Sequence, residues 1–260
     1  LSQPTRTPWN PERFMRPEPE ILEAQRLTNA SVSALFTAAD LTPRQRKSLI
    51  SFQSAREGRE GLEKLAELLP QEDELQQREE LQAGDNMFGS DLKQQMQGAL
   101  TVMQSGLGSS ADLSLGGFDS HENHDAVHDA LYTHLADSIT FFWDYAEALG
   151  LADRILLVVG SDFGRTNMYN NGNGKDHWPI GSYMLMEQGA RWGNRVVGAS
   201  AELHFARRIN PGSLEVSDSG IVVTPAHIHR AVQQYLGLDD FAAQNGVGIQ
   251  NVEDIPLFSS

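Results

Sequence analysis

Apolar side chains recur at three- and four-residue intervals over much of the first hundred residues, which is the spacing of one face of an α-helix. The pattern predicts helices over residues 20–36, 42–69 and 90–108. Thr42 followed by Pro43 is typical of a helix start, because a hydroxyl caps free N–H groups and proline fits the first turn. Ser90 is a second such start. We therefore expect a helical region over residues 21–110.

The segments around these helices have a different character. Residues 1–20 carry five prolines, which predicts an extended arm, because each proline removes a backbone donor and fixes φ. Residues 70–82 are rich in charge, and we expect a solvated connection or an exposed helix face there.

The pattern changes at Ala111. A short apolar run at residues 111–115 predicts a strand, residues 125–150 predict a long amphipathic helix, and residues 154–160 predict a buried strand. The apolar stripe of that helix comprises Leu131, Leu135, Ile139, Phe142 and Ala146. A strand–helix–strand unit places its strands parallel with a right-handed crossover. The predicted fold class is therefore α/β, a mainly parallel sheet flanked by helices, with a helical N-terminal region.

The last third of the chain continues this alternation. Residues 182–187 predict another strand, and residues 224–238 predict a helix that is capped by Thr224 and has Pro225 in its first turn. We expect residues 111–260 to form one α/β region that carries the functional site.

Composition narrows the classes of function. The formal net charge of −15 argues against a nucleic-acid or anionic-membrane surface. The longest apolar runs are strand-sized, so no membrane span is predicted. The chain has no cysteine, so a metal ion must be held by His, Asp, Glu, Asn or a hydroxyl.

Acidic and histidine side chains gather directly after the first predicted strand. The stretch "GGFDSHENHDAVH" contains Asp119, His121, His124 and His128, and the last two lie one helical turn apart. In open α/β sheets ligands bind beyond the carboxyl ends of the strands. Such a cluster suits a divalent metal ion. The alternative is a capped helix start in which the histidines form a polar first turn.

Two further motifs follow the second predicted strand. "SDFGRT" supplies Asp162 as a metal ligand and Arg165 as a group that binds a phosphate or sulfate. "GNGKDHWP" supplies Asp176 and His177 on a glycine-rich loop. Taken singly, the first motif is also explained by an Arg–Asp pair that fixes a turn, and the second by a surface turn. Their repeated placement near strand ends favours a shared, binuclear metal site.

The HENH stretch and the remaining histidines do not indicate a further catalytic or metal site. "HENH" is one residue short of the HExxH motif, which argues against a metalloprotease. A structural role is expected for His134, His204, His227 and His229.

The motifs "GGFDSH", "SDFGRT" and "GKDHW", in that order and with a long helix between the first two, resemble the bacterial family catalogued as domain of unknown function 1501 (DUF1501). That family is similar to the alkaline phosphatase and sulfatase superfamily of metallohydrolases. The resemblance covers about residues 91–237. It implies an alkaline-phosphatase-like fold, and export by the twin-arginine route to the periplasm or the outside of the cell.

Residue by residue, the resemblance implies one metal ion held by Asp119, His121 and His177, and a second held by Asp162. Zinc or manganese is the expected ion, and calcium or magnesium is the alternative. The sequence departs from the superfamily at Phe163, where a histidine usually follows the aspartate. The second ion would then need His124 or Asp176 to complete its ligands.

These observations lead to competing functions. The first is a metal-dependent hydrolase that acts on a small anionic phosphate or sulfate ester. The alternative is a non-catalytic metal-binding or envelope-associated protein that keeps the fold, and a third is a helical partner domain.

The superfamily also supplies a nucleophile from an early strand, and no such Gly-Asp-Ser segment precedes Asp119. We therefore expect this chain to be the C-terminal part of a longer protein. Its N-terminal segment, or another protein chain, would pair with the sheet edge.

Overall fold

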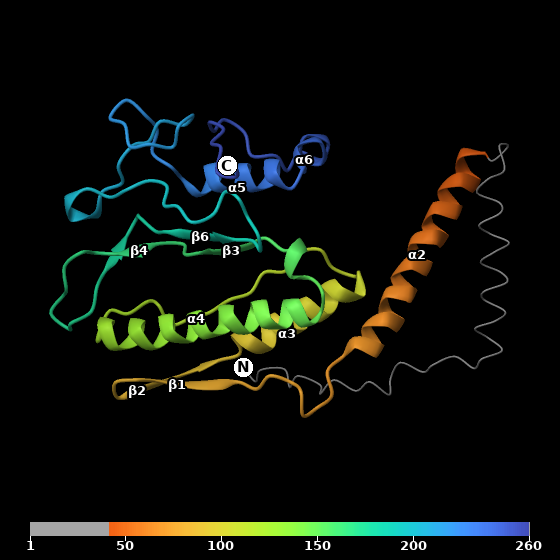
Figure 1. Cartoon of the computed structure of the whole chain (residues 1–260), viewed down its shortest axis with the longest axis horizontal. Coiled ribbons are helices and arrows are strands. Elements are labelled where there is room, and N and C mark those ends of the chain that lie inside the picture. The colour runs from red at the N-terminus through yellow and green to blue at the C-terminus, as the bar shows by residue number, and fades with distance from the viewer. Residues whose placement is uncertain (1–41, 260) are drawn as a thin grey trace, which may run out of the picture. The chain divides into compact units, whose positions relative to one another are not determined.

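The computed structural model describes residues 42–259, which divide into two units (Figure 1). The two units contain residues 42–78 with 91–114, and residues 79–90 with 115–259. The predicted arm over residues 1–20 and the predicted helix over residues 20–36 lie outside the described residues. The predicted division of the chain near residue 110 stays a prediction.

The first unit contains α2 (Pro43–Leu68) and α3 (Leu92–Ser105), and both helices were predicted. The Thr42 hydroxyl accepts a hydrogen bond from the Gln45 N–H at 3.3 Å, and the Gln45 side chain accepts one from the Thr42 N–H at 2.9 Å. This reciprocal pair is a capping box. The second predicted start is wrong by one residue, because α3 follows Asp91 instead of Ser90.

The strand predicted over residues 111–115 does not form. Residues 108–121 contain no helix or strand. The side-chain amide of Gln95 donates to the Ser114 carbonyl at 3.0 Å and accepts from the Ser114 N–H at 2.9 Å. One glutamine thus satisfies the backbone groups that a neighbouring strand would otherwise pair.

Residues 70–78 form the predicted connection, but the end of the charged segment, residues 79–82, belongs to a β-hairpin that was not predicted. Its strands are β1 (Glu79–Ala83) and β2 (Asn86–Ser90), which pair antiparallel. Although β1 is mostly polar, its alternate side chains turn toward the core, as the two-residue period of a strand requires. The hairpin shares a buried cluster with the first half of the long helix of the second unit. That cluster comprises Ala83, Val127 and Leu131, with Leu81, Phe88 and Phe118 packed against it.

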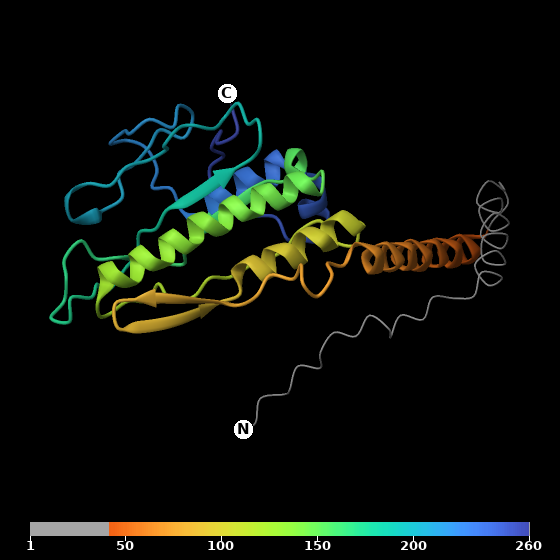
Figure 2. The same cartoon turned by 60° about the horizontal axis from the view of Figure 1, so that its bottom comes forward.

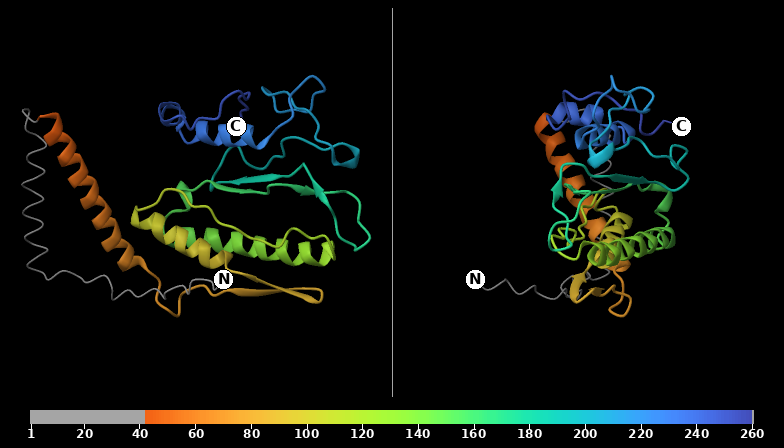
Figure 3. Two further views of the ribbon diagram at one scale, coloured as in Figure 1. Left: turned by 180° about the vertical axis from the view of Figure 1, so that it is seen from behind. Right: turned by 90° about the vertical axis from the view of Figure 1, so that its left-hand side faces the viewer.

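The second unit is layered. In Figures 1 and 3 the hairpin, α4 (His124–Ala148), the pair of β3 (Leu157–Gly160) with β6 (Tyr183–Met186), and α5 (Pro225–Tyr235) follow one another in that order. Figure 2 shows the hairpin lying along the first half of α4. The shorter elements are η2 (Ala152–Arg154), β4 (Gly164–Arg165), β5 (His177–Trp178), η3 (Glu202–His204) and α6 (Asp239–Asn245).

The long helix buries the predicted stripe in part. Leu131, Phe142 and Ala146 are buried, and His134 is buried beside them. His134 Nε2 lies 2.8 Å from the Ser90 hydroxyl, so this histidine has the structural role that was predicted. His227 is likewise buried at the start of α5. There its Nδ1 accepts a hydrogen bond from the Thr224 N–H at 3.1 Å.

The predicted strands at residues 154–160 and 182–187 are confirmed as β3 and β6, but they pair antiparallel. Among the described residues all three strand pairs are antiparallel. The structure therefore shows the expected mixture of helices and strands, without the parallel pair that residues 111–115 would have supplied. None of the helices described combines the length and the apolar character that a membrane span needs.

Candidate metal site

Two loops of the second unit meet beside the start of α4. The first loop, residues 116–123, leads into α4, and the second, residues 161–178, contains β4 and β5. Backbone hydrogen bonds join the loops, from the Lys175 N–H to the Ser120 carbonyl at 3.1 Å and from the His124 N–H to the Asn173 carbonyl at 3.0 Å. The two loops therefore position their side chains against each other.

Glycine at position 174 allows this close approach. A Cβ atom added there would lie 1.8 Å from the carbonyl oxygen of His121, which is far inside van der Waals contact. The sequence predicts that this glycine-rich loop approaches a ligand, whereas the structure shows it approaching the backbone of the other loop.

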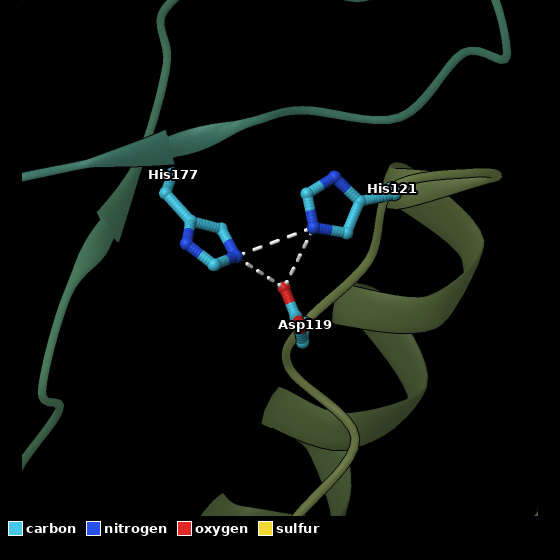
Figure 4. Close-up of side chains that lie close together, drawn as sticks. All are labelled: Asp119, His121 and His177. Atoms are coloured by element: carbon cyan, nitrogen blue, oxygen red, sulfur yellow. Dashed lines mark hydrogen bonds and ion pairs between the residues drawn. The ribbon is translucent and has the colours of Figure 1, made fainter.

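Asp119, His121 and His177 bring three ligand atoms together (Figure 4). Asp119 Oδ1 lies 3.1 Å from His121 Nε2 and 2.9 Å from His177 Nε2, and the two Nε2 atoms are 3.2 Å apart. Among residues 42–259 no other group of three such residues meets the geometry of a metal site. The structure thus brings together three of the residues that the sequence singled out.

The triangle of atoms fits a divalent metal ion. Ligands held at about 2.0–2.1 Å from a tetrahedral ion are separated by roughly 3.3 Å, close to the three separations observed. One carboxylate oxygen and two imidazole nitrogens are also a donor set that zinc accepts. The three side chains are 49–58% exposed, so one side of the triangle is open to solvent.

Arg165 stabilises the ionised form of Asp119. Its guanidinium donates to Asp119 Oδ1 and to the Lys175 carbonyl, the latter at 2.8 Å. Arg165 belongs to β4 and pairs with His177 of the neighbouring strand β5. The hydrogen bond from Arg165, followed by that from His177, lowers the pKa of Asp119 to about 2. Asp119 is therefore a carboxylate at neutral pH and available to a cation.

Asp176, expected as a ligand, lies instead behind His121. Its Oδ1 is 3.2 Å from His121 Nδ1, the ring nitrogen that faces away from the triangle. Hydrogen bonds from the Asn170 amide and from His121 lower the pKa of Asp176. A carboxylate on the second nitrogen of a metal-binding histidine fixes its tautomer and ring orientation. Asp176 is thus placed to orient His121.

His124, also expected as a ligand, contacts the first loop from α4. Its Nδ1 lies 2.8 Å from the buried Ser120 hydroxyl, and its ring contacts that of His128, tilted by 37° with centroids 3.9 Å apart. Burial lowers the pKa of His124 to about 4. His128 Nε2 lies 3.0 Å from the Phe118 carbonyl, and burial lowers the pKa of His128 as well. Both rings are therefore neutral groups that hold the loop carrying Asp119 and His121.

Asp162 is exposed and lies outside the triangle, so its role as a metal ligand stays a prediction. The neighbouring Phe163 contacts the triangle, because its ring stacks on His177 with centroids 4.1 Å apart. The Arg165 guanidinium lies 5.0 Å from the centre of the same ring.

Sequence reasoning missed Asn170, which ties the two loops together. Its amide donates to the His121 carbonyl at 2.9 Å and to Asp176 at 3.3 Å, while its oxygen accepts from the Gly172 and Gly174 N–H groups. Asparagine often bonds to backbone two residues further on, so the Asn-Gly pattern of "YNNGNG" was the available signal.

Comparison with known proteins bears on the family and not on the activity. Residues 6–240 match the family described as "Protein of unknown function (DUF1501)", and the chain belongs to that family. No curated protein and no solved structure matches the chain.

Proposed function

We propose that this chain is a metal-dependent hydrolase of phosphate or sulfate esters, with a divalent cation held by Asp119, His121 and His177. The observation that carries the proposal is the triangle of ligand atoms, whose sides measure 2.9–3.2 Å. Three protein ligands with an open side are typical of catalytic metal sites, which keep a position for water or substrate.

The groups of the chain are suited to this chemistry. A bound cation would polarise an ester oxygen and lower the pKa of a bound water. Asp119 is ionised at neutral pH, and Asp176 orients His121. Arg165 contributes N–H groups that can bind an oxygen of the anion.

The negative charge of the chain means that an anionic substrate needs cations close to its binding site. With a net charge of −15 the protein repels anions from most of its surface. An anionic ester therefore depends on local cations, and the cation and Arg165 would supply them side by side.

Several finer features belong to the same proposal. They are zinc or manganese as the ion, an alkaline-phosphatase-like parallel sheet completed by a further segment or chain beside β3 and β6, and a location in the periplasm or outside the cell. The resemblance of the three motifs supports them.

A non-catalytic metal-binding protein is the second candidate, and the hydroxyl groups favour it. Ser120 is bonded to His124, the Ser161 hydroxyl donates to the Phe163 carbonyl at 2.6 Å, and the Thr166 hydroxyl donates to the Met168 carbonyl at 2.8 Å. Ser161 and Thr166 are held by backbone carbonyls and Ser120 is buried, so a hydrolase of this design would use water as its nucleophile.

A substrate panel tests the proposal. The protein would be loaded with zinc or manganese and assayed on p-nitrophenyl phosphate and p-nitrophenyl sulfate, beside the variants Asp119→Asn and Asp153→Asn. We expect turnover that requires the metal and falls at least a hundredfold in Asp119→Asn. The control Asp153→Asn removes an exposed carboxylate beyond the far end of α4 and should keep full activity. Tight metal binding without turnover of either ester would favour the second candidate.

A further inference from the structure

The Arg165 side chain is much less exposed than the metal ligand beside it. Its side chain is only 9% exposed, although the Asp119 side chain to which it bonds is 58% exposed. A nearly buried guanidinium at the edge of an open site is costly unless its N–H groups have partners. The Lys175 carbonyl and the Asp119 carboxylate each accept one of its five N–H donors, and the Phe163 ring lies 5.0 Å away.

We propose that Arg165 takes the place of a second metal ion, so that the site holds one divalent cation beside one fixed guanidinium. The inference rests on the proposed function, because it assumes a metal ion in the triangle of ligands. It adds how many metal ions the site holds. Arg165 donates to Asp119 Oδ1, the same oxygen that faces His121 and His177, and the lone pairs of a carboxylate oxygen allow it to serve a metal ion and Arg165 together.

The ligands that a second ion would need are committed elsewhere. Asp176 is bonded to His121 and Asn170, and His124 is bonded to Ser120. Asp162 lies outside the group of converging ligand atoms, and the Phe163 ring beside it packs on His177 and supplies no ligand atom.

The arrangement indicates the chemistry of the ligand. Two metal ions can clamp the attacking and leaving oxygens of an ester symmetrically. One ion with one guanidinium is asymmetric. Two of the five guanidinium N–H donors of Arg165 are used by Lys175 and Asp119, and the remaining ones can donate to an oxygen of a tetrahedral oxyanion. We therefore expect inorganic phosphate or sulfate to bridge the metal ion and Arg165.

Metal stoichiometry and anion affinity test the inference. The wild-type protein and the variants Arg165→Gln, Arg165→Lys and Arg154→Gln would be saturated with zinc, freed of loose ions by gel filtration, and analysed for metal per chain. Orthophosphate affinity would then be measured from the visible spectrum of the cobalt-substituted proteins. Arg154→Gln is the matched control, since it removes the same charge beyond the far end of α4.

We expect one ion per wild-type chain. The dissociation constant for orthophosphate should rise at least tenfold in Arg165→Gln, rise less in Arg165→Lys, and stay unchanged in Arg154→Gln. Two tightly held ions in the wild type, or unchanged phosphate affinity in folded Arg165→Gln, would overturn the inference. Circular dichroism establishes folding, and the wild-type stoichiometry decides the matter if Arg165→Gln does not fold.

The outcomes separate this inference from the proposed function. One ion per chain, with phosphate affinity that depends on Arg165 but without ester turnover, would refute the hydrolase and leave the inference standing. A wild-type protein that binds no zinc would refute both.

Discussion

Replacing Gly174 by alanine should separate the two loops that carry the metal ligands. The added Cβ would lie 1.8 Å from the His121 carbonyl oxygen, and Cβ contacts below 3.0 Å essentially do not occur. The loops must therefore move apart by about 1.2 Å, the difference between these distances, because the opposing atom is backbone and cannot rotate away.

The size of the effect follows from the hydrogen bonds that such a shift breaks. The bonds from Lys175 to Ser120 and from His124 to Asn173 would lengthen beyond about 4 Å. Each contributes about 0.5–1.5 kcal/mol, so we expect a loss of roughly 1–3 kcal/mol in the free energy of unfolding. Because His121 is carried on the displaced loop, zinc affinity should fall by about 10- to 100-fold.

Urea unfolding and calorimetric zinc titration measure the two effects. Gly116→Ala is the control, since it lies on the loop that carries His121, and a Cβ there would meet nothing within 4 Å. We expect the control to match the wild type in zinc affinity. Equal zinc affinity and stability in Gly174→Ala and Gly116→Ala would show that the loop contact does not position the site.

Three further predictions concern the surroundings of the site. Asp176→Asn should weaken zinc binding by about 10- to 100-fold in a calorimetric titration, because it no longer orients His121 through an ionised carboxylate; an unchanged affinity would argue against this role. Since burial lowers the pKa of His124 from 6.5 to about 4, the unfolded chain binds its proton first, so stability should fall as pH drops from about 6.5 to 4. Urea unfolding of the metal-free protein would measure this, and an equally steep fall in His124→Ala would contradict it. Leu131→Ala, at a position only 1% exposed in the cluster shared with the hairpin, should lower the free energy of unfolding by about 2–5 kcal/mol, and a loss below 1 kcal/mol in urea would refute that packing.

Local patterns in the sequence predicted the helices best. The capping chemistry at Thr42 and Thr224 and the long stripe of α4 are encoded within a few turns, so they can be read without knowledge of the fold. The strand expected at residues 111–115 does not form, and there both backbone groups of Ser114 bond to the side chain of Gln95, a contact that no local pattern reveals.

The same distinction holds for the site. The residue types of Asp119, His121 and His177 identified metal ligands before their meeting point was known. The sequence could not distinguish Asp176 and His124 from the ligands, because their roles depend on which ring nitrogen or hydroxyl they face. Such contacts arise only when two loops fold against each other.

X-ray absorption at the zinc edge tests the central claim most directly, because it reports the atoms that surround the ion. The site described above predicts two imidazole nitrogens and oxygen ligands at about 2.0–2.1 Å in the wild type. One imidazole should remain in His177→Ala, and two in the control His229→Ala, whose histidine is exposed on α5. A wild-type spectrum with no bound imidazole, or one that His177→Ala leaves unchanged, would contradict the assignment of Asp119, His121 and His177 as a metal site.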